Sequence, residues 1–149
     1  MGLIYDRVLV AVDGSQEAEW AFNKSVEICK RNNASLIISH IVDTRTYATV
    51  EVYDRTIAQR SEEYASQLVS EYKNRAHQEG LQDVKTVIEY GSPKVKIAKD
   101  IAPRYKVDLI ICGATGLNAV ERFFIGSVSE HITRYAKCDV LVVRTQKEN

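Results

Sequence analysis

Short apolar runs alternate along the chain with longer stretches in which apolar residues recur every three or four positions. The runs are rich in β-branched residues and do not alternate strictly with polar ones, which is typical of strands covered on both faces of a parallel sheet. Five strands are therefore predicted, at Arg7–Val12, Ser35–Val42, Lys85–Glu89, Asp108–Cys112 and Asp139–Val143.

The stretches between these strands predict amphipathic helices. Ser15 is a suitable N-cap for the first, and the third follows Ser92 as cap and Pro93 in the first turn, with Val95 on its apolar side. Strand and helix repeat to the end of the chain, which is the pattern of a doubly wound α/β domain with helices on both faces of the sheet. The predicted helices are Gln16–Asn32, Arg55–Glu79, Lys94–Tyr105, and one that opens at Ser127 with a capping box closed by Glu130.

The 149 residues predict a single domain over residues 1–149, because no linker or shift in composition divides them. A chain of this length buries a sizeable core without a disulfide or a metal. The stretch that lacks clear periodicity is Asp43–Asp54, which is polar and rich in threonine. We interpret it as a mobile connection, with a functional lid as the alternative.

Charge and cysteine content lower the expectation of several partner classes. Twenty Lys and Arg residues balance 20 Asp and Glu residues, so no positive field is available to gather nucleic acid or an anionic membrane. The three cysteines are odd in number and form no C-x-x-C motif, which favours reduced thiols in a cytoplasmic protein over disulfides or a zinc cluster. No apolar run approaches 18 residues, so no membrane-spanning helix is expected.

The candidate chemistry lies where strands end. Ligands of open α/β sheets bind beyond the carboxyl ends of the strands. The fourth strand runs into Gly113-Ala114-Thr115-Gly116, and Gly126-Ser127 opens the last helix. Glycines at 113 and 116 permit positive φ and close backbone approach, and a helix N-terminus adds free amides and a favourable dipole. Two amide sources separated by a loop can grip a polyphosphate from both sides.

Each of these residues also has a purely structural interpretation. Gly113 alone could end a strand, and Ser127 alone could serve only as an N-cap; their joint spacing favours the anion site. Asp13 either caps the first helix or accepts a hydrogen bond from a ribose hydroxyl, and spacing does not decide between these roles. His40 is interpreted as a hydrogen-bonded core imidazole. The P-loop motif and G-x-G-x-x-G are absent, which disfavours those two nucleotide sites.

The sequence resembles the universal stress proteins, specifically their ATP-binding branch, over essentially its whole length. The segments that carry the resemblance are YDRVLVAVDGS, HIVD, GSP, VDLIICGATG and CDVLVVR. The family's nucleotide signature, G-x2-G-x9-G-[ST], is met without gaps by Gly113, Gly116, Gly126 and Ser127.

The resemblance implies a five-stranded parallel sheet of order 3-2-1-4-5, Rossmann-like and similar to adenine nucleotide alpha hydrolases. It places adenine and ribose at Asp13 and the end of the second strand, ribose also at Gly113, and the phosphates around Gly116 and the start of the last helix. The ATP-binding residues that it implies are Val12, Asp13, Ile41, Val42, Gly113, Gly116, Gly126, Ser127, Val128 and Ser129.

The implied function is a nucleotide-dependent regulatory module of the stress response. ATP is the expected ligand, with Mg²⁺ or Mn²⁺ as a companion of its phosphates. Turnover is expected to be slow or absent, because no nucleophile or transition-state cation can be assigned. The resemblance also implies a homodimer formed by antiparallel pairing of Val140–Val143.

Two other functions remain open from the sequence. One is an ATP hydrolase or nucleotidyl-transfer enzyme at the same site, which would recruit Asp13, Glu121 or Arg122. The other is a dimeric interaction protein without a ligand, whose glycines serve only as turns.

Overall fold

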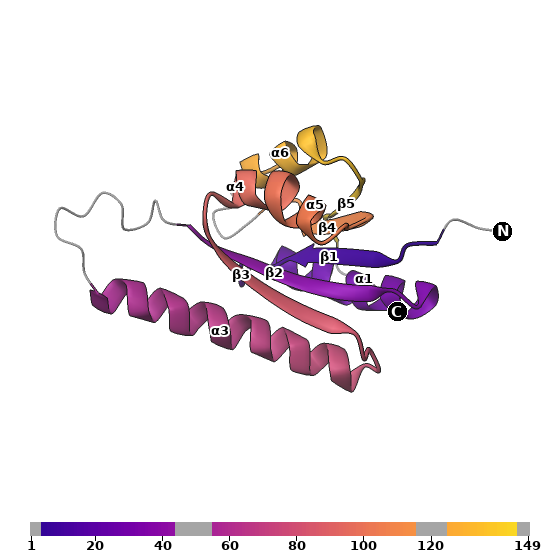
Figure 1. Cartoon of the computed structure of the whole chain (residues 1–149), viewed down its shortest axis with the longest axis horizontal. Helices are drawn as coiled ribbons and strands as arrows, with labels where there is room; N and C mark the ends of the chain where they lie inside the picture. The colour runs from indigo at the N-terminus through magenta and orange to yellow at the C-terminus, as the bar shows by residue number, and fades with distance from the viewer. Residues whose placement is uncertain (1–3, 44–54, 116–124, 146–149) are drawn as a thin grey trace.

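The computed structural model describes residues 4–43, 55–115 and 125–145, with the side chains of residues 55–57 left aside. A five-stranded sheet of order β3-β2-β1-β4-β5 forms its centre, and every neighbouring pair is parallel (Figure 1). The doubly wound fold and the strand order are therefore confirmed. The strands are β1 (Arg7–Ala11), β2 (Ser35–Asp43), β3 (Val84–Gly91), β4 (Leu109–Gly113) and β5 (Asp139–Val143).

Helices cover both faces of this sheet (Figure 1). Two of them pack on one face, and the other helical segments pack on the opposite face. The first face carries α1 (Gln16–Asn32) and α3 (Arg55–Gln78), and the second carries α4 (Pro93–Lys96), η1 (Ile97–Ile101), α5 (Ala102–Arg104) and α6 (Ser127–Tyr135).

The core consists of two apolar layers, one on each side of the sheet. In β2, Leu36 and Ile38 face α1 and α3, whereas Ile37 and Ile41 face η1 and α6. Successive side chains of a strand point to opposite faces, so a central strand with helices on both sides is apolar throughout. This explains why the strands appear in the sequence as continuous apolar runs.

The third predicted helix is one helical segment with a π turn in its middle. Pro103 has no amide to donate, and the Ala102 amide donates to the Ile97 carbonyl, five residues back. The residues that pack on the sheet begin at Ile97, and α4 contributes no buried residue. Val95 is 44% exposed, so the prediction that it lies on the buried side is wrong.

The two helix starts that the sequence singled out differ in their caps. Ser15 is the N-cap of α1, as predicted, and its Oγ accepts from the Ala18 amide at 3.2 Å. The N-cap of α6 is Gly126, one residue before the predicted cap Ser127. Glu130 forms an ion pair with Arg134 at 3.0 Å, so the predicted capping box is wrong.

None of the helices in the described ranges has the length and apolar character that a membrane crossing requires.

Candidate functional site

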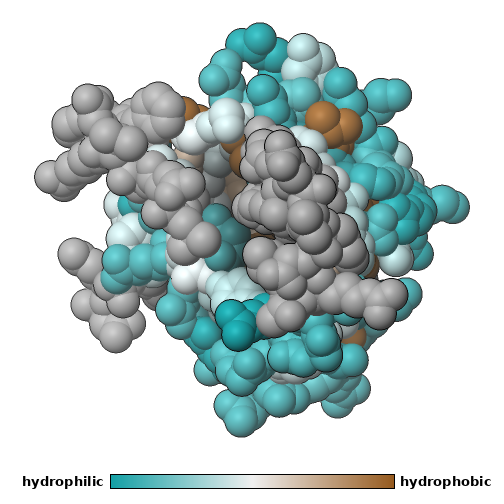
Figure 2. All heavy atoms as spheres, turned by 90° about the vertical axis from the view of Figure 1, so that its left-hand side faces the viewer, coloured by the Kyte–Doolittle hydropathy of each residue, from teal (hydrophilic) through white to brown (hydrophobic). Residues whose placement is uncertain are grey.

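The predicted site lies at the carboxyl edge of the sheet, which is the left-hand edge in Figure 1. Figure 2 faces this edge, and hydrophilic and intermediate residues are visible at the centre of the view. The described residues come from the ends of β1, β2 and β4 and from the starts of α1 and α6. The topology therefore brings together segments that are far apart in the sequence, as the ligand rule for open α/β sheets requires.

Two hydrogen bonds join the end of β4 to the start of α6. The Gly126 amide donates to the Ala114 carbonyl oxygen at 2.8 Å. The hydroxyl of Ser129, a buried residue, donates to the Gly113 carbonyl oxygen. The predicted meeting of these segments is confirmed, but the Gly126 amide is not free. Because a glycine cap has no side chain, the first-turn amides of α6 receive no hydrogen bond from their N-cap residue.

Gly113 has a different role from the one its sequence suggested. It is the last residue of β4, and positive φ values among the described glycines occur at Gly14, Gly80 and Gly91 instead. Gly113 therefore does not use the positive φ that a glycine permits. A Cβ atom on Gly113 would lie 2.9 Å from the Glu17 Cβ and 3.0 Å from its backbone carbon. The absence of a side chain at Gly113 thus allows the first turn of α1 to pack closely against β4.

Glu17 is a site residue that the sequence analysis missed. Its carboxylate accepts a hydrogen bond from the Thr115 amide at 2.7 Å, across the gap between α1 and the end of β4. In the sequence it is an ordinary acidic residue in the first turn of a helix, where the dipole favours it. No spacing signal connects it to a partner 98 positions away.

Asp13 stabilises the turn between β1 and α1. One of its carboxylate oxygens accepts from the Ser15 amide at 2.9 Å, and Ser15 itself caps the helix. Asp13 is therefore not the N-cap of α1, which is one of the two roles that its sequence position left open. It stabilises the turn that precedes the cap. Its role toward a ribose hydroxyl stays a prediction.

The end of β2 is closely packed against the end of β1. The Nδ1 atom of His40 lies 2.8 Å from the Val12 carbonyl oxygen, so this buried imidazole is hydrogen-bonded, as predicted. The Val12 amide donates to the Ser39 carbonyl at 2.9 Å. Ile41 and Val42 are both buried, and their role toward adenine and ribose stays a prediction.

Tyr64 reaches this edge of the sheet from α3. Its ring stands edge-on to His40 with 6.1 Å between centroids, and the residue is 49% exposed. Gly14 has φ +84°, and a Cβ there would collide with the Tyr64 hydroxyl. The sequence signals the turn at Gly14 but not its long-range contact with Tyr64. Two further tyrosines of the segment Asp43–Asp54, Tyr47 and Tyr53, lie outside the described residues.

Several other predicted groups fall in the same undescribed ranges, so the structure does not place them. They are Gly116, Glu121, Arg122 and the part of the segment Asp43–Asp54 that follows Asp43.

The described groups provide no activated thiol and no metal cluster. Burial raises the pKa of Cys112 to about 11, against a smaller opposing effect of its hydrogen bond with Ser129. Its thiol is therefore neutral at physiological pH and is a poor nucleophile. Within residues 4–43, 55–115 and 125–145, no group of three His, Cys, Asp or Glu side chains is placed to hold a metal ion.

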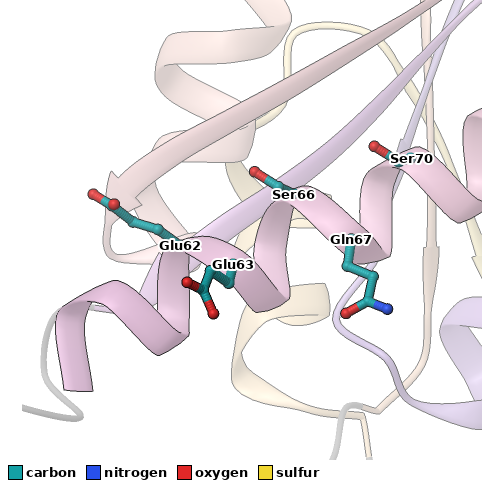
Figure 3. Close-up of a pocket in the computed structure, with 5 residues that line it drawn as sticks. All are labelled: Glu62, Glu63, Ser66, Gln67 and Ser70. Carbon is teal, nitrogen blue, oxygen red and sulfur yellow. The ribbon is translucent and has the colours of Figure 1, made fainter. Parts of the chain in front are cut away.

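A surface hollow lies along α3 (Figure 3). Its labelled lining side chains all belong to α3, and none belongs to the predicted site. They are Glu62, Glu63, Ser66, Gln67 and Ser70.

Comparison with known proteins identifies the family. The model of the universal stress protein family matches residues 4–144. The chain belongs to this family. A universal stress protein of Staphylococcus haemolyticus is 53% identical over 145 residues, which cover 97% of this chain and 88% of that protein.

Solved universal stress proteins share the fold over nearly the whole chain. UspA from Lactobacillus plantarum is 29% identical with a TM-score of 0.79, and the match covers 96% of this chain and 100% of that one. A universal stress protein in complex with cAMP is 26% identical with a TM-score of 0.71, and the match covers 96% of this chain and 99% of that one.

Proposed function

We propose that this universal stress protein binds an adenine nucleotide, ATP in particular, and acts as a nucleotide-dependent regulatory module of the stress response. The observation that carries the proposal is the hydrogen bond between the Gly126 amide and the Ala114 carbonyl. It holds the uncapped start of α6 beside the end of β4. A related protein of the same fold forms a complex with cAMP, which supports an adenine nucleotide as the ligand class.

In this proposal the site has two parts. The ends of β1 and β2 hold adenine and ribose, with the second oxygen of the Asp13 carboxylate as an acceptor for a ribose hydroxyl. The first-turn amides of α6, at Ser127, Val128 and Ser129, hold the phosphates. Hydrogen bonds to charged groups contribute about 1.5–3 kcal/mol each, so three of them are sufficient for affinity in the micromolar range.

Slow or absent turnover belongs to the same proposal. Fast phosphoryl transfer requires an oriented nucleophile, a metal on the phosphates and a cation that meets the developing charge. The described part of the chain offers no metal cluster, so Mg²⁺ or Mn²⁺ would be held chiefly by the phosphates themselves. Bound nucleotide then acts through its binding energy, which stabilises the liganded conformation.

We also propose that the protein forms a homodimer through Val140–Val143. This segment belongs to β5, which is at the end of the strand order and pairs with β4 on one side. Its open side offers backbone groups that a second copy can satisfy.

The test of nucleotide binding combines two measurements. Mass spectrometry of the small molecules released when the purified protein is denatured is expected to detect an adenine nucleotide. Calorimetric titration with ATP is expected to give at least about tenfold weaker binding to Gly126→Val, because the branched side chain projects toward the Ala114 oxygen and the Thr115 Cα, where the end of β4 meets the start of α6. If the folded Gly126→Val protein binds ATP as tightly as the natural protein, the start of α6 does not hold the phosphates. If the natural protein binds no ATP, an interaction protein whose glycines are only turns is favoured.

A further inference from the structure

The Glu17 carboxylate brings a negative charge to the place where the proposed function puts phosphates. Its Oε2 is 2.7 Å from the Thr115 amide. The Cα of Thr115 is in turn 3.5 Å from the position of a Cβ on Gly126, the N-cap of α6. The carboxylate therefore lies at the junction of β4 and α6, where it accepts a hydrogen bond from a backbone amide.

This charge is not neutralised by a neighbouring cation in the described part of the chain. Glu19, in the same turn of α1, pairs with Arg75 at 2.8 Å, whereas Glu17 has the Thr115 amide as its partner. Asp13, at the end of β1, adds a second carboxylate, which bonds the Ser15 amide. Among the described residues, two carboxylates at the carboxyl edge of the sheet thus accept hydrogen bonds from neutral backbone amides.

We propose that Glu17 is a specificity-determining residue that limits the preference of this site for highly charged phosphate chains. The inference rests on the proposed nucleotide binding. A phosphate oxygen can take the Thr115 amide only when Glu17 releases it, and a phosphate that binds beside it is repelled by a like charge in a partly desolvated site. The repulsion grows with the number of phosphate charges, and both effects vanish for neutral adenosine.

Glu17→Gln tests this charge with little change in shape. The glutamine oxygen still accepts from the Thr115 amide, so the junction with β4 is retained. Calorimetric titrations with adenosine, AMP and ATP in EDTA are expected to show ATP binding at least about fivefold tighter than in the natural protein, AMP binding improved less, and adenosine binding unchanged. Excess Mg²⁺ is expected to reduce the gain for ATP, because the metal neutralises part of the phosphate charge.

Glu19→Gln is the matched control, since it removes the same charge from the same helical turn without touching Thr115. It is expected to leave the ratio of ATP to adenosine affinity unchanged. Glu17→Ala, which also releases the Thr115 amide, is a second variant. Its gain in affinity is expected to be largest for ATP, smaller for AMP and absent for adenosine.

The outcomes separate this inference from the proposal beneath it. If the natural protein binds ATP and Glu17→Gln binds it no tighter, or gains equally for adenosine, the role of Glu17 is overturned and nucleotide binding stands. If neither protein binds any of the three ligands, both are overturned. If only Glu17→Gln binds ATP, the role of Glu17 is supported and ATP is not a ligand of the natural protein.

Discussion

The Ala114 carbonyl oxygen accepts a hydrogen bond from the Gly126 amide at 2.8 Å, and this contact fixes where α6 begins. It joins the end of β4 to a helix whose N-cap has no side chain. The first turn of α6 is consequently held at the carboxyl edge of the sheet, beside the end of β4. The proposed nucleotide site depends on this arrangement more than on any single side chain.

Gly113 and Gly126 are expected to differ in their tolerance of a methyl group. A Cβ on Gly113 would lie 2.9 Å from the Glu17 Cβ, whereas one on Gly126 would meet the Ala114 oxygen at 3.4 Å, an ordinary contact. Gly113→Ala is expected to lower the free energy of unfolding by about 1–3 kcal/mol, because α1 must shift away from β4. Gly126→Ala, the control, lacks this clash and is expected to lower it by about 0.5 kcal/mol, because alanine is a poorer N-cap than glycine. Urea unfolding of both variants provides the comparison, and equal losses would contradict the proposed role of Gly113 in packing.

Ser15→Ala tests the cap of α1. Loss of its hydrogen bond to the Ala18 amide is expected to lower the free energy of unfolding by about 1 kcal/mol. Ser66→Ala, on the exposed side of α3, removes a hydroxyl from a helix interior and is expected to have no destabilising effect. Thermal unfolding followed by circular dichroism measures both. A Ser15→Ala protein as stable as the natural one would show that the Asp13 turn alone suffices to start the helix.

Two buried thiols predict a loss of stability at alkaline pH. Burial raises the pKa of Cys29 to about 12 and that of Cys112 to about 11, from an ordinary value of 9.0. Well below pH 9 both thiols are protonated in the folded and unfolded states, so their ionisation does not lower the free energy of unfolding. Above about pH 9 the unfolded chain loses these protons first, and the free energy of unfolding falls by up to about 1.4 kcal/mol per pH unit for each thiol.

Cys112→Ala isolates this effect, because it removes one titrating thiol and leaves the lysines and tyrosines in place. Urea unfolding between pH 8 and pH 10.5 is expected to give a shallower decline for Cys112→Ala than for the natural protein. Comparison of slopes separates the titration from the cavity that the substitution leaves. Parallel declines would mean that the Cys112 thiolate is tolerated in the fold.

The proposed dimer can be tested on the two edge strands of the same sheet. A lysine on an edge strand opposes pairing with another strand. Val142→Lys, on β5, is expected to convert a dimer into a monomer at micromolar concentration, as measured by light scattering after size exclusion. Thr86→Lys, at an exposed position of β3 at the opposite edge, is the control and is expected to remain dimeric. A dimer in both variants, or a monomeric natural protein, would exclude β5 as the interface.

Local patterns in the sequence predicted most of the fold. The predicted bounds of α1 and β5 agree with the structure, because apolar periodicity, the Ser15 cap and β-branched runs are short-range signals. The predicted start of α6 at Ser127 agrees with the structure, but its N-cap was misplaced by one residue, since the hydrogen bond from the Gly126 amide to Ala114 is not revealed by any local pattern. The prediction for Val95 was wrong because this residue lies in the first turn of its helical segment, before the residues that pack on the sheet.

The site was predictable only in part, because its long-range contacts leave no local signal in the sequence. The glycine spacing indicated which segments meet, and the structure brings the described ones together. It did not indicate that Gly113 accommodates α1, that Glu17 accepts from the Thr115 amide, or that Tyr64 contacts Gly14. These contacts join residues on different elements, and their partners are set by the packing of helices on the sheet rather than by sequence spacing.

The most direct test of nucleotide binding is a crystal structure of the protein soaked with ATP. The expected result is density for an adenine nucleotide at the carboxyl edge of the sheet, with phosphate oxygens within hydrogen-bond distance of the Ser127 and Val128 amides and the ribose near Asp13. A nucleotide bound elsewhere, or an edge filled by the protein's own chain, would contradict it.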